Sequence, residues 1–231
     1  MLNKKWVKYI IYLALASAST AIGIISKTSV PVIFLNLLGN IVLVLYIEGF
    51  YIANFCSPVY NIGLIILSMQ QHLYGQVIST VFVIAMAITM AIVWAKKTND
   101  GIVKARKMSV RFSALVLVGW IVAVAAGYLV MWLFDSTARF LNSIQMVSKI
   151  YASCLLLLRL YENQGFYMAA DAASLGMWIV TGNFAMVAQC GVALLYDAQG
   201  IYNWKRMANE SGEVYLASFE RGKKVEKENT R

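Results

Sequence analysis

Charged side chains are scarce in this 231-residue chain, because only 13% of its residues are Asp, Glu, Lys or Arg, whereas 60% are hydrophobic. A soluble domain of this size would carry about 25% charged residues. Apolar runs of roughly 20 residues recur along the chain, and each is long enough to cross a bilayer. The composition therefore excludes an ordinary soluble domain and predicts an integral membrane protein whose partner is the lipid bilayer.

The residue types and motifs of common enzyme sites are also missing. The chain has a single histidine, and its three cysteines do not have the spacing of a metal site. It has no Gly-Lys-Ser phosphate loop and no Gly-x-Ser-x-Gly nucleophile motif. We also expect no lysine at the middle of a span, which argues against a retinal Schiff base. These absences predict no catalytic residue, no metal and no cofactor.

Positive charge is what the chain does have, with a net charge of +9 concentrated at residues 3–8, 96–111 and 205–231. These segments flank apolar spans, which is the positive-inside pattern, so we expect both termini to be cytoplasmic and no nucleic-acid partner. Eight spanning helices bring all three segments to one side of the membrane. We predict them at residues 7–25, 31–48, 50–71, 74–95, 112–134, 139–160, 162–181 and 183–205.

The two halves of the chain resemble each other at an offset of 110 residues. This offset places Tyr51 on Tyr161, Asn61 on Asp171, Tyr74 on Phe184, Trp94 on Trp204 and Lys96 on Arg206. A chance alignment of apolar helices is the alternative explanation. We predict an all-α membrane fold with two parallel three-helix repeats, a linker helix between them and one leading helix. The limits are 1–30 for the leading helix, 31–97 and 139–207 for the repeats, 98–138 for a basic cytoplasmic loop with the linker helix, and 208–231 for a disordered cytoplasmic tail.

Four polar or aromatic side chains on the third and seventh spans are candidates for a solute site. Asn61 and Asp171 fall near the centres of these spans, where polar groups face a cavity or a partner. The alternative for Asn61 is a hydrogen bond between helices. Tyr167 and Trp178 have aromatic faces that can stack on a planar, cationic ring, although packing within the bundle explains each equally well.

A further set of candidates lies at the ends of the same two spans. Glu162 and Asn163 follow Arg159, and the three-residue spacing of Arg159 and Glu162 allows an ion pair on one helix face. These residues either complete or gate the site, or they anchor the helix end. Gln71, at the end of the third span, is a further candidate for binding.

The order Arg-x-x-Glu-Asn at 159–163, then Asp171, then Gly200 to Arg206 resembles the PnuC family of vitamin transporters. The stretch from Leu73 to Lys96 is similar to the first half of that family, so the resemblance covers residues 31–207. It implies a fold like that of the SWEET sugar transporters and homotrimers, and the short loops separately favour a bacterial inner membrane. It also implies facilitated diffusion of a vitamin-like nucleoside by alternating access, with metabolic trapping by phosphorylation. One difference is that Gln164 and Tyr167 stand where that family has tryptophan, which leaves the identity of the substrate open.

Nicotinamide riboside is the foremost substrate under this resemblance, because Asp171 favours a cation. Thiamine or a deoxynucleoside is the alternative. Two remote alternatives come from other classes of protein. A membrane enzyme would need a nucleophile and base, or metal ligands, in one cavity. A membrane protein that transports nothing would have no central polar cavity, and its Asn61 and Asp171 would bond to each other or to neighbouring helices.

Overall fold

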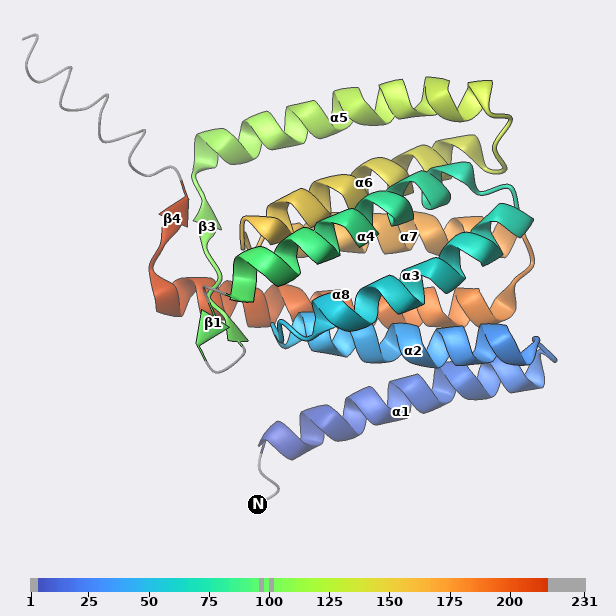
Figure 1. Cartoon of the computed structure of the whole chain (residues 1–231), viewed down its shortest axis with the longest axis horizontal. Helices are drawn as coiled ribbons and strands as arrows, with labels where there is room; N and C mark the ends of the chain where they lie inside the picture. Colours follow the sequence, from blue (N-terminus) through green and yellow to red (C-terminus); the bar gives the residue numbers. More distant parts are fainter. Residues whose placement is uncertain (1–3, 96–97, 100–101, 216–231) are drawn as a thin grey trace, which may run out of the picture.

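The computed structural model describes residues 4–95, 98–99 and 102–215. These residues form eight α-helices, which lie side by side in Figure 1. The all-α fold is therefore confirmed, and each predicted span corresponds to one helix. The helices are α1 (Lys4–Ile25), α2 (Val30–Ile47), α3 (Ala53–Gln70), α4 (Tyr74–Ala95), α5 (Val110–Leu133), α6 (Arg139–Leu157), α7 (Asn163–Val180) and α8 (Phe184–Ser211).

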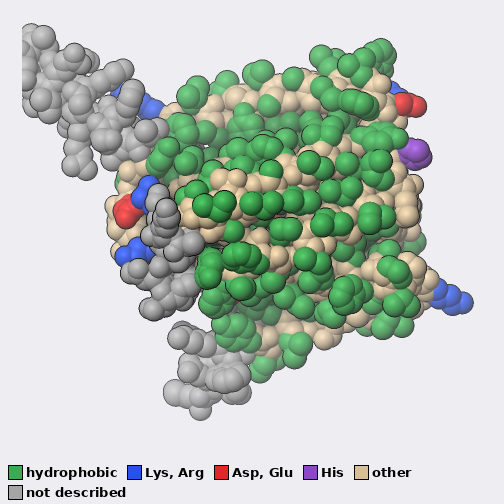
Figure 2. Space-filling view, viewed as in Figure 1, with side chains coloured by type: hydrophobic (Ala, Val, Ile, Leu, Met, Phe, Trp, Pro, Cys, Tyr) green, Lys and Arg blue, Asp and Glu red, His purple; other side chains and the backbone are tan. Residues whose placement is uncertain are grey.

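The outer surface of the helices matches a bilayer. Large apolar side chains such as Leu115, Ile121 and Leu129 on α5 are exposed. Figure 2 shows hydrophobic side chains over the middle of the molecule and charged side chains at its two ends. Five helices (α2, α4, α5, α6 and α8) are long and apolar enough to span a membrane by length and composition. Helices α3 and α7, which have 18 residues like α2, are also part of the bundle, and their polar side chains reduce their mean hydropathy.

The two repeats are visible in the helix bounds themselves. Adding 110 to the bounds of α3, 53 and 70, gives 163 and 180, which are the bounds of α7. The same addition maps the first residue of α4, 74, onto the first residue of α8, 184. Helices α2–α4 and α6–α8 are thus two parallel three-helix repeats, with α1 leading and α5 linking them. The residue limits predicted for the domains stay predictions, and residues 96 and 97 lie outside the described residues.

Each repeat packs its third helix against the first helix of the other. The Trp94 indole of α4 donates a hydrogen bond to the Leu157 carbonyl of α6, at 3.4 Å. The Trp204 indole of α8 donates to the Tyr46 carbonyl of α2, at 3.1 Å. Both indoles are fully buried. This reciprocal arrangement places the space between the repeats at the centre of the bundle.

One end of the bundle carries four two-residue strands within the described residues. β1 (Thr98–Asn99) pairs antiparallel with β2 (Ile102–Val103), and β3 (Lys107–Met108) pairs parallel with β4 (Val214–Tyr215). We call this end, which carries Lys104–Arg111 and Lys205–Arg206, the basic end. All four strands lie in or beside segments that were predicted to be a loop and a tail.

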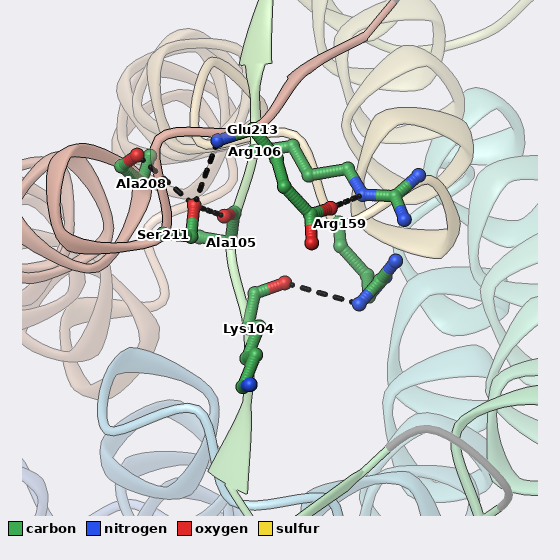
Figure 3. A network of polar contacts seen from close by, with 7 residues as sticks. All are labelled: Lys104, Ala105, Arg106, Arg159, Ala208, Ser211 and Glu213. Carbon is green, nitrogen blue, oxygen red and sulfur yellow. Dashed lines mark hydrogen bonds and ion pairs between the residues drawn. The ribbon is translucent and has the colours of Figure 1, made fainter.

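The prediction of a disordered tail from residue 208 was wrong for residues 208–215. Helix α8 continues to Ser211, whose hydroxyl donates to the Ala105 carbonyl at 2.6 Å. Beyond it, Glu213 forms an ion pair with Arg106, at 2.5 Å (Figure 3). These contacts hold the tail because the loop offers free carbonyls and a cation at the basic end. Residues 216–231 lie outside the described residues.

Candidate binding site between the two repeats

A cavity lies between the repeats and is lined by all six of their helices. Its volume is 90 Å³, and no residue of α1 or α5 lines it. Ligand pockets commonly measure about 300–1,000 Å³, so the cavity is small in this conformation. The polar and charged residues that line it are Tyr46, Ser57, Tyr60, Asn61, Gln76, Lys149, Tyr167, Asp171, Ser174, Trp178 and Gln189.

Asn61 lines the cavity from α3, and it bonds within its own helix. Its amide nitrogen donates to the Ser57 carbonyl and to the Ser57 hydroxyl, both at 2.8 Å. Only 3% of the Asn61 side chain is exposed. The amide nitrogen therefore bonds within α3 and does not form the hydrogen bond between helices that was the alternative. These bonds hold the Asn61 amide in place at the cavity wall.

Asp171 lines the cavity from α7, opposite a cation that the sequence analysis overlooked. The prediction that no lysine lies at mid-membrane was wrong, because Lys149 is near the middle of α6 and also lines the cavity. Asp171 interacts electrostatically with Lys149 and with Asp197 of α8. Both Lys149 and Asp171 are half-buried, whereas Asp197 is buried. Lys149 and Asp171 line the cavity, while Asp197 lies behind the wall and interacts with Asp171. We call these three residues the charge cluster, and intramembrane charges of this kind mark functional sites.

The two predicted aromatic residues lie in the cavity wall on the same helix. The Tyr167 hydroxyl is 3.3 Å from the Ser153 hydroxyl, a hydrogen bond in which either can donate. Trp178 is fully buried, and its indole nitrogen has no partner among the described residues. Both rings line the cavity. They are therefore placed to meet the face or edge of a planar ligand.

Two glutamines also present unused hydrogen-bonding capacity to the cavity. The side-chain carbonyls of Gln76 and Gln189 have no partner within the described part of the chain. The Gln189 amide donates to the Tyr60 hydroxyl at 3.2 Å, which ties α8 to α3. Unpaired buried polar atoms cost free energy unless a ligand or water satisfies them. Sequence reasoning missed Gln76, Gln189 and Lys149, although a lysine at the centre of a predicted span was a signal that could have been used.

Three predicted site residues are not among those that line this cavity. Gln71 is the C-cap residue of α3, and Glu162 and Asn163 lie at the start of α7. The Glu162 carboxylate accepts a hydrogen bond from the Met108 amide at 2.9 Å, and the Asn163 amide donates to the Leu160 carbonyl. Burial raises the pKa of Glu162, and the bond from Met108 partly opposes that rise.

The predicted ion pair between Arg159 and Glu162 is also absent from the described residues. Both lie in the connection between α6 and α7 and not on one helix face, because Arg159 adopts a left-handed backbone with φ +62°. Its guanidinium instead donates to the Lys104 carbonyl at 3.4 Å (Figure 3). Glu162 borders a second hollow of 310 Å³, which Trp120 of α5 and Phe166 of α7 also line. No residue of the first repeat lines that hollow, so a solute there would not contact both halves.

The arrangement of the polar residues also provides evidence on the two remote alternatives, a membrane enzyme and a membrane protein that transports nothing. No group of three or more His, Cys, Asp or Glu side chains able to hold a metal ion is found in the part of the chain that is described. His72 lies in the connection between α3 and α4, where its ring contacts Tyr74, and it does not line the cavity. A central polar cavity is present, which is the opposite of what a protein without a solute site would have.

Comparisons with known proteins identify a family and a shared fold for the chain. A family model described as "Nicotinamide mononucleotide transporter" matches residues 29–206, which is more than half of the chain. A solved structure, "Crystal structure of the Vitamin B3 transporter PnuC", is similar with a TM-score of 0.77 and 17% sequence identity, over 88% of this chain and 92% of that one. At this identity the likeness shows a shared fold. No curated protein matches the chain.

Proposed function

The chain belongs to the nicotinamide mononucleotide transporter family, and we propose that it carries a small cationic nucleoside, foremost nicotinamide riboside, by facilitated diffusion. The observation that carries this proposal is the cavity between the repeats. It is lined by all six repeat helices and contains Asp171, the one carboxylate among its lining residues. Membrane transporters built from repeats hold their solutes at such an interface.

Each half would contribute a different kind of contact to the ligand. Asp171 would balance the positive ring, and Asn61 would hydrogen-bond the sugar. Tyr167 and Trp178 would stack on the base, with the free indole N–H of Trp178 available to an acceptor. The unpaired carbonyls of Gln76 and Gln189 would accept hydrogen bonds from sugar hydroxyls. The Trp178 indole nitrogen and the two glutamine carbonyls are polar atoms that the protein itself leaves unsatisfied within the described part of the chain.

Alternating access follows as a proposal from the small size of the cavity. A nucleoside does not fit 90 Å³ unless the side chains or the helices move apart. Movement of one repeat against the other would open the cavity to one side at a time. Glu162 and Asn163 lie at the basic end of α7, so we assign them to gating at that end and not to ligand contact. Gln71 lies at the opposite end of α3, where it would meet a ligand only during entry or exit.

The cellular setting is proposed from the resemblance and the charge pattern. The basic end would face the cytoplasm, with both termini on that side of a bacterial inner membrane. Phosphorylation inside the cell would trap the substrate, so the protein itself would need no energy source. A homotrimer is proposed on the same basis.

Thiamine is the second candidate, because it also carries a fixed positive charge. A deoxynucleoside lacks that charge, so Asp171 gives no reason to prefer it. The similar solved structure is that of a vitamin B3 transporter, and this favours nicotinamide riboside over thiamine as the substrate. The cation site therefore ranks the candidates as nicotinamide riboside, thiamine and then deoxynucleosides.

Calorimetry on detergent-purified protein tests the proposal. The ligands are nicotinamide riboside, thiamine, a deoxynucleoside and riboflavin, each titrated into the native protein and Asp171→Asn. Asp135→Asn is the matched control, because Asp135 is an exposed partner of Arg139 outside the cavity. We expect saturable binding of nicotinamide riboside that Asp171→Asn weakens and Asp135→Asn does not. Binding of none of the four ligands would contradict the proposal.

A further inference from the structure

One lysine lies at the cavity between the repeats, and the protein itself gives it no direct partner. Lys149 of α6 is half-buried and lines the cavity. Its ammonium group forms no hydrogen bond and no ion pair within the described part of the chain. An ammonium group held away from water is unfavourable unless an acceptor satisfies it. A ligand that fills the cavity is therefore expected to bring an acceptor to Lys149.

Asp171 of α7 provides the opposite charge in the same cavity. It interacts electrostatically with Lys149, which stabilises the ammonium form, but the two groups do not form an ion pair in the described structure. Both charges therefore remain available to a ligand. A ligand with a positive ring and an electron-rich oxygen at its edge suits this pair, because the ring meets Asp171 and the oxygen meets Lys149. In the reverse orientation each charge would meet its own sign.

The other polar groups of the cavity leave the role of charged donor to Lys149. The free side-chain oxygens of Gln76 and Gln189 accept hydrogen bonds and cannot donate them. The indole nitrogen of Trp178 is a free donor, but it is neutral. Lys149 is the one lysine or arginine among the described residues that line the cavity. A charged donor binds a carbonyl or carboxylate oxygen more strongly than a neutral donor does.

We propose that Lys149 binds the acyl oxygen on the ring of the transported ligand, so that the site selects pyridinium ribosides with a carbonyl or carboxylate group. The carboxamide of nicotinamide riboside supplies such an oxygen. Nicotinic acid riboside has a carboxylate in its place, so its two charges meet Asp171 and Lys149, and it becomes a second substrate. Thiamine has no acyl group. This inference rests on the proposed function and concerns affinity alone, so facilitated diffusion needs no energy source.

Calorimetry on detergent-purified protein tests the role of Lys149 with three ligands that share the pyridinium ring and the ribose. They are nicotinamide riboside, nicotinic acid riboside and N-ribosylpyridinium, which has no acyl group. The native protein should bind the first two about tenfold to a hundredfold more tightly than the third, as a hydrogen bond to a charged group predicts. Transport into lipid vesicles should show the same order, with nicotinic acid riboside competing against labelled nicotinamide riboside.

Lys149→Met should remove the preference for an acyl group. Nicotinamide riboside should then bind no more tightly than N-ribosylpyridinium. Nicotinic acid riboside should bind more weakly than either, because its carboxylate would have no counter-charge near Asp171. Lys149→Gln keeps a neutral donor, so it should retain a preference of about threefold to tenfold for the carboxamide and lose the binding of the carboxylate. Lys205→Met is the matched control, because Lys205 is exposed on α8 and does not line the cavity.

The possible results are distinct. Equal binding of the three ribosides by the native protein would overturn the role of Lys149 and leave the proposed function standing. A preference for the acyl group that persists in Lys149→Met, or an equal loss for all three ligands, would also overturn it. Binding of none of the ribosides would contradict the proposed function and this inference with it. If Lys149→Met does not fold, the native protein and Lys149→Gln still decide.

Discussion

The two repeats share a backbone and differ in the charge that they bring to the cavity. At the end of the first helix of each repeat, Gly49 and Arg159 occupy equivalent positions and have φ values of +76° and +62°. The amide of the residue that follows each of them donates to a carbonyl five residues earlier, at 2.9 Å in the first repeat and 3.0 Å in the second. Equivalent backbone geometry is therefore built by glycine in one repeat and arginine in the other.

The charge cluster has no charged counterpart in the first repeat. Subtracting 110 from Lys149, Asp171 and Asp197 gives Gly39, Asn61 and Ala87. Gly39 has a role of its own, since a Cβ there would come within 2.7 Å of the Tyr60 ring. The first repeat thus provides close packing and neutral hydrogen bonds, while the second provides all the charge. The comparison teaches that a symmetric backbone can hold an asymmetric site.

The largest expected effect comes from removing the charge on the second repeat. Asp171→Asn should weaken nicotinamide riboside binding by about tenfold to a hundredfold, since a hydrogen bond or ion pair to a charged group contributes about 1.5–3 kcal/mol. Calorimetric titration of each variant measures this loss of affinity. Binding of an uncharged nucleoside, if detectable, should change much less. Equal losses for charged and uncharged ligands would contradict a charge-specific role.

The equivalent change in the first repeat should have a smaller and less selective effect. Asn61→Leu should weaken every bound nucleoside by about threefold to tenfold, because a neutral hydrogen bond contributes about 0.5–1.5 kcal/mol. The same titrations measure it. If Asn61→Leu discriminated between charged and uncharged ligands as strongly as Asp171→Asn, the division of roles between the repeats would be wrong.

A third prediction concerns the backbone of the connection between α7 and α8, which lies opposite the basic end. Gly182 has φ +72° and an added Cβ would meet nothing within 4 Å, so Gly182→Ala should cost about 1–2 kcal/mol of unfolding free energy through backbone conformation alone. Gly165→Ala is the matched control, since its Cβ also meets nothing but its backbone is helical. Thermal unfolding in detergent should show a lower Tm for the first variant and an equal or higher Tm for the second.

The smallest expected effect is at Glu162, whose pKa is raised by burial. The folded protein holds this proton to a higher pH than the unfolded chain does, so its stability contribution decreases as pH rises from the ordinary Glu pKa through the raised one. Glu162→Gln should flatten the decrease of Tm over that range. An unchanged slope of Tm against pH would show that Glu162 does not titrate with folding.

Much of the fold could be predicted from the sequence, because membrane spans depend mainly on local composition. The bounds predicted for α4, residues 74–95, are those observed, and α6 begins at residue 139 as predicted. The resemblance to the transporter family was also confirmed. Asn61, Tyr167, Asp171 and Trp178 were predicted together and line one cavity.

The remaining parts of the site depended on contacts between distant segments. Lys149 was overlooked. For Glu162 the sequence left open whether it completes the site, gates it or anchors the helix end, and it could not show the bond that its carboxylate accepts from the Met108 amide, about fifty residues earlier. The tail beyond residue 208 was predicted to be disordered because it is polar. Its ion pair to Arg106 and its strand pairing are visible only once the loop and α8 lie side by side.

By itself, the sequence determined the number and approximate position of the membrane-spanning helices and their repetition, since the free energy of burying a segment in lipid depends mainly on that segment. Only the tertiary structure decided which polar side chains share a cavity, because that depends on the rotation and depth of each helix against its neighbours. The charge cluster shows the difference. Its three members lie on three successive helices, and packing of α6, α7 and α8 brings them together.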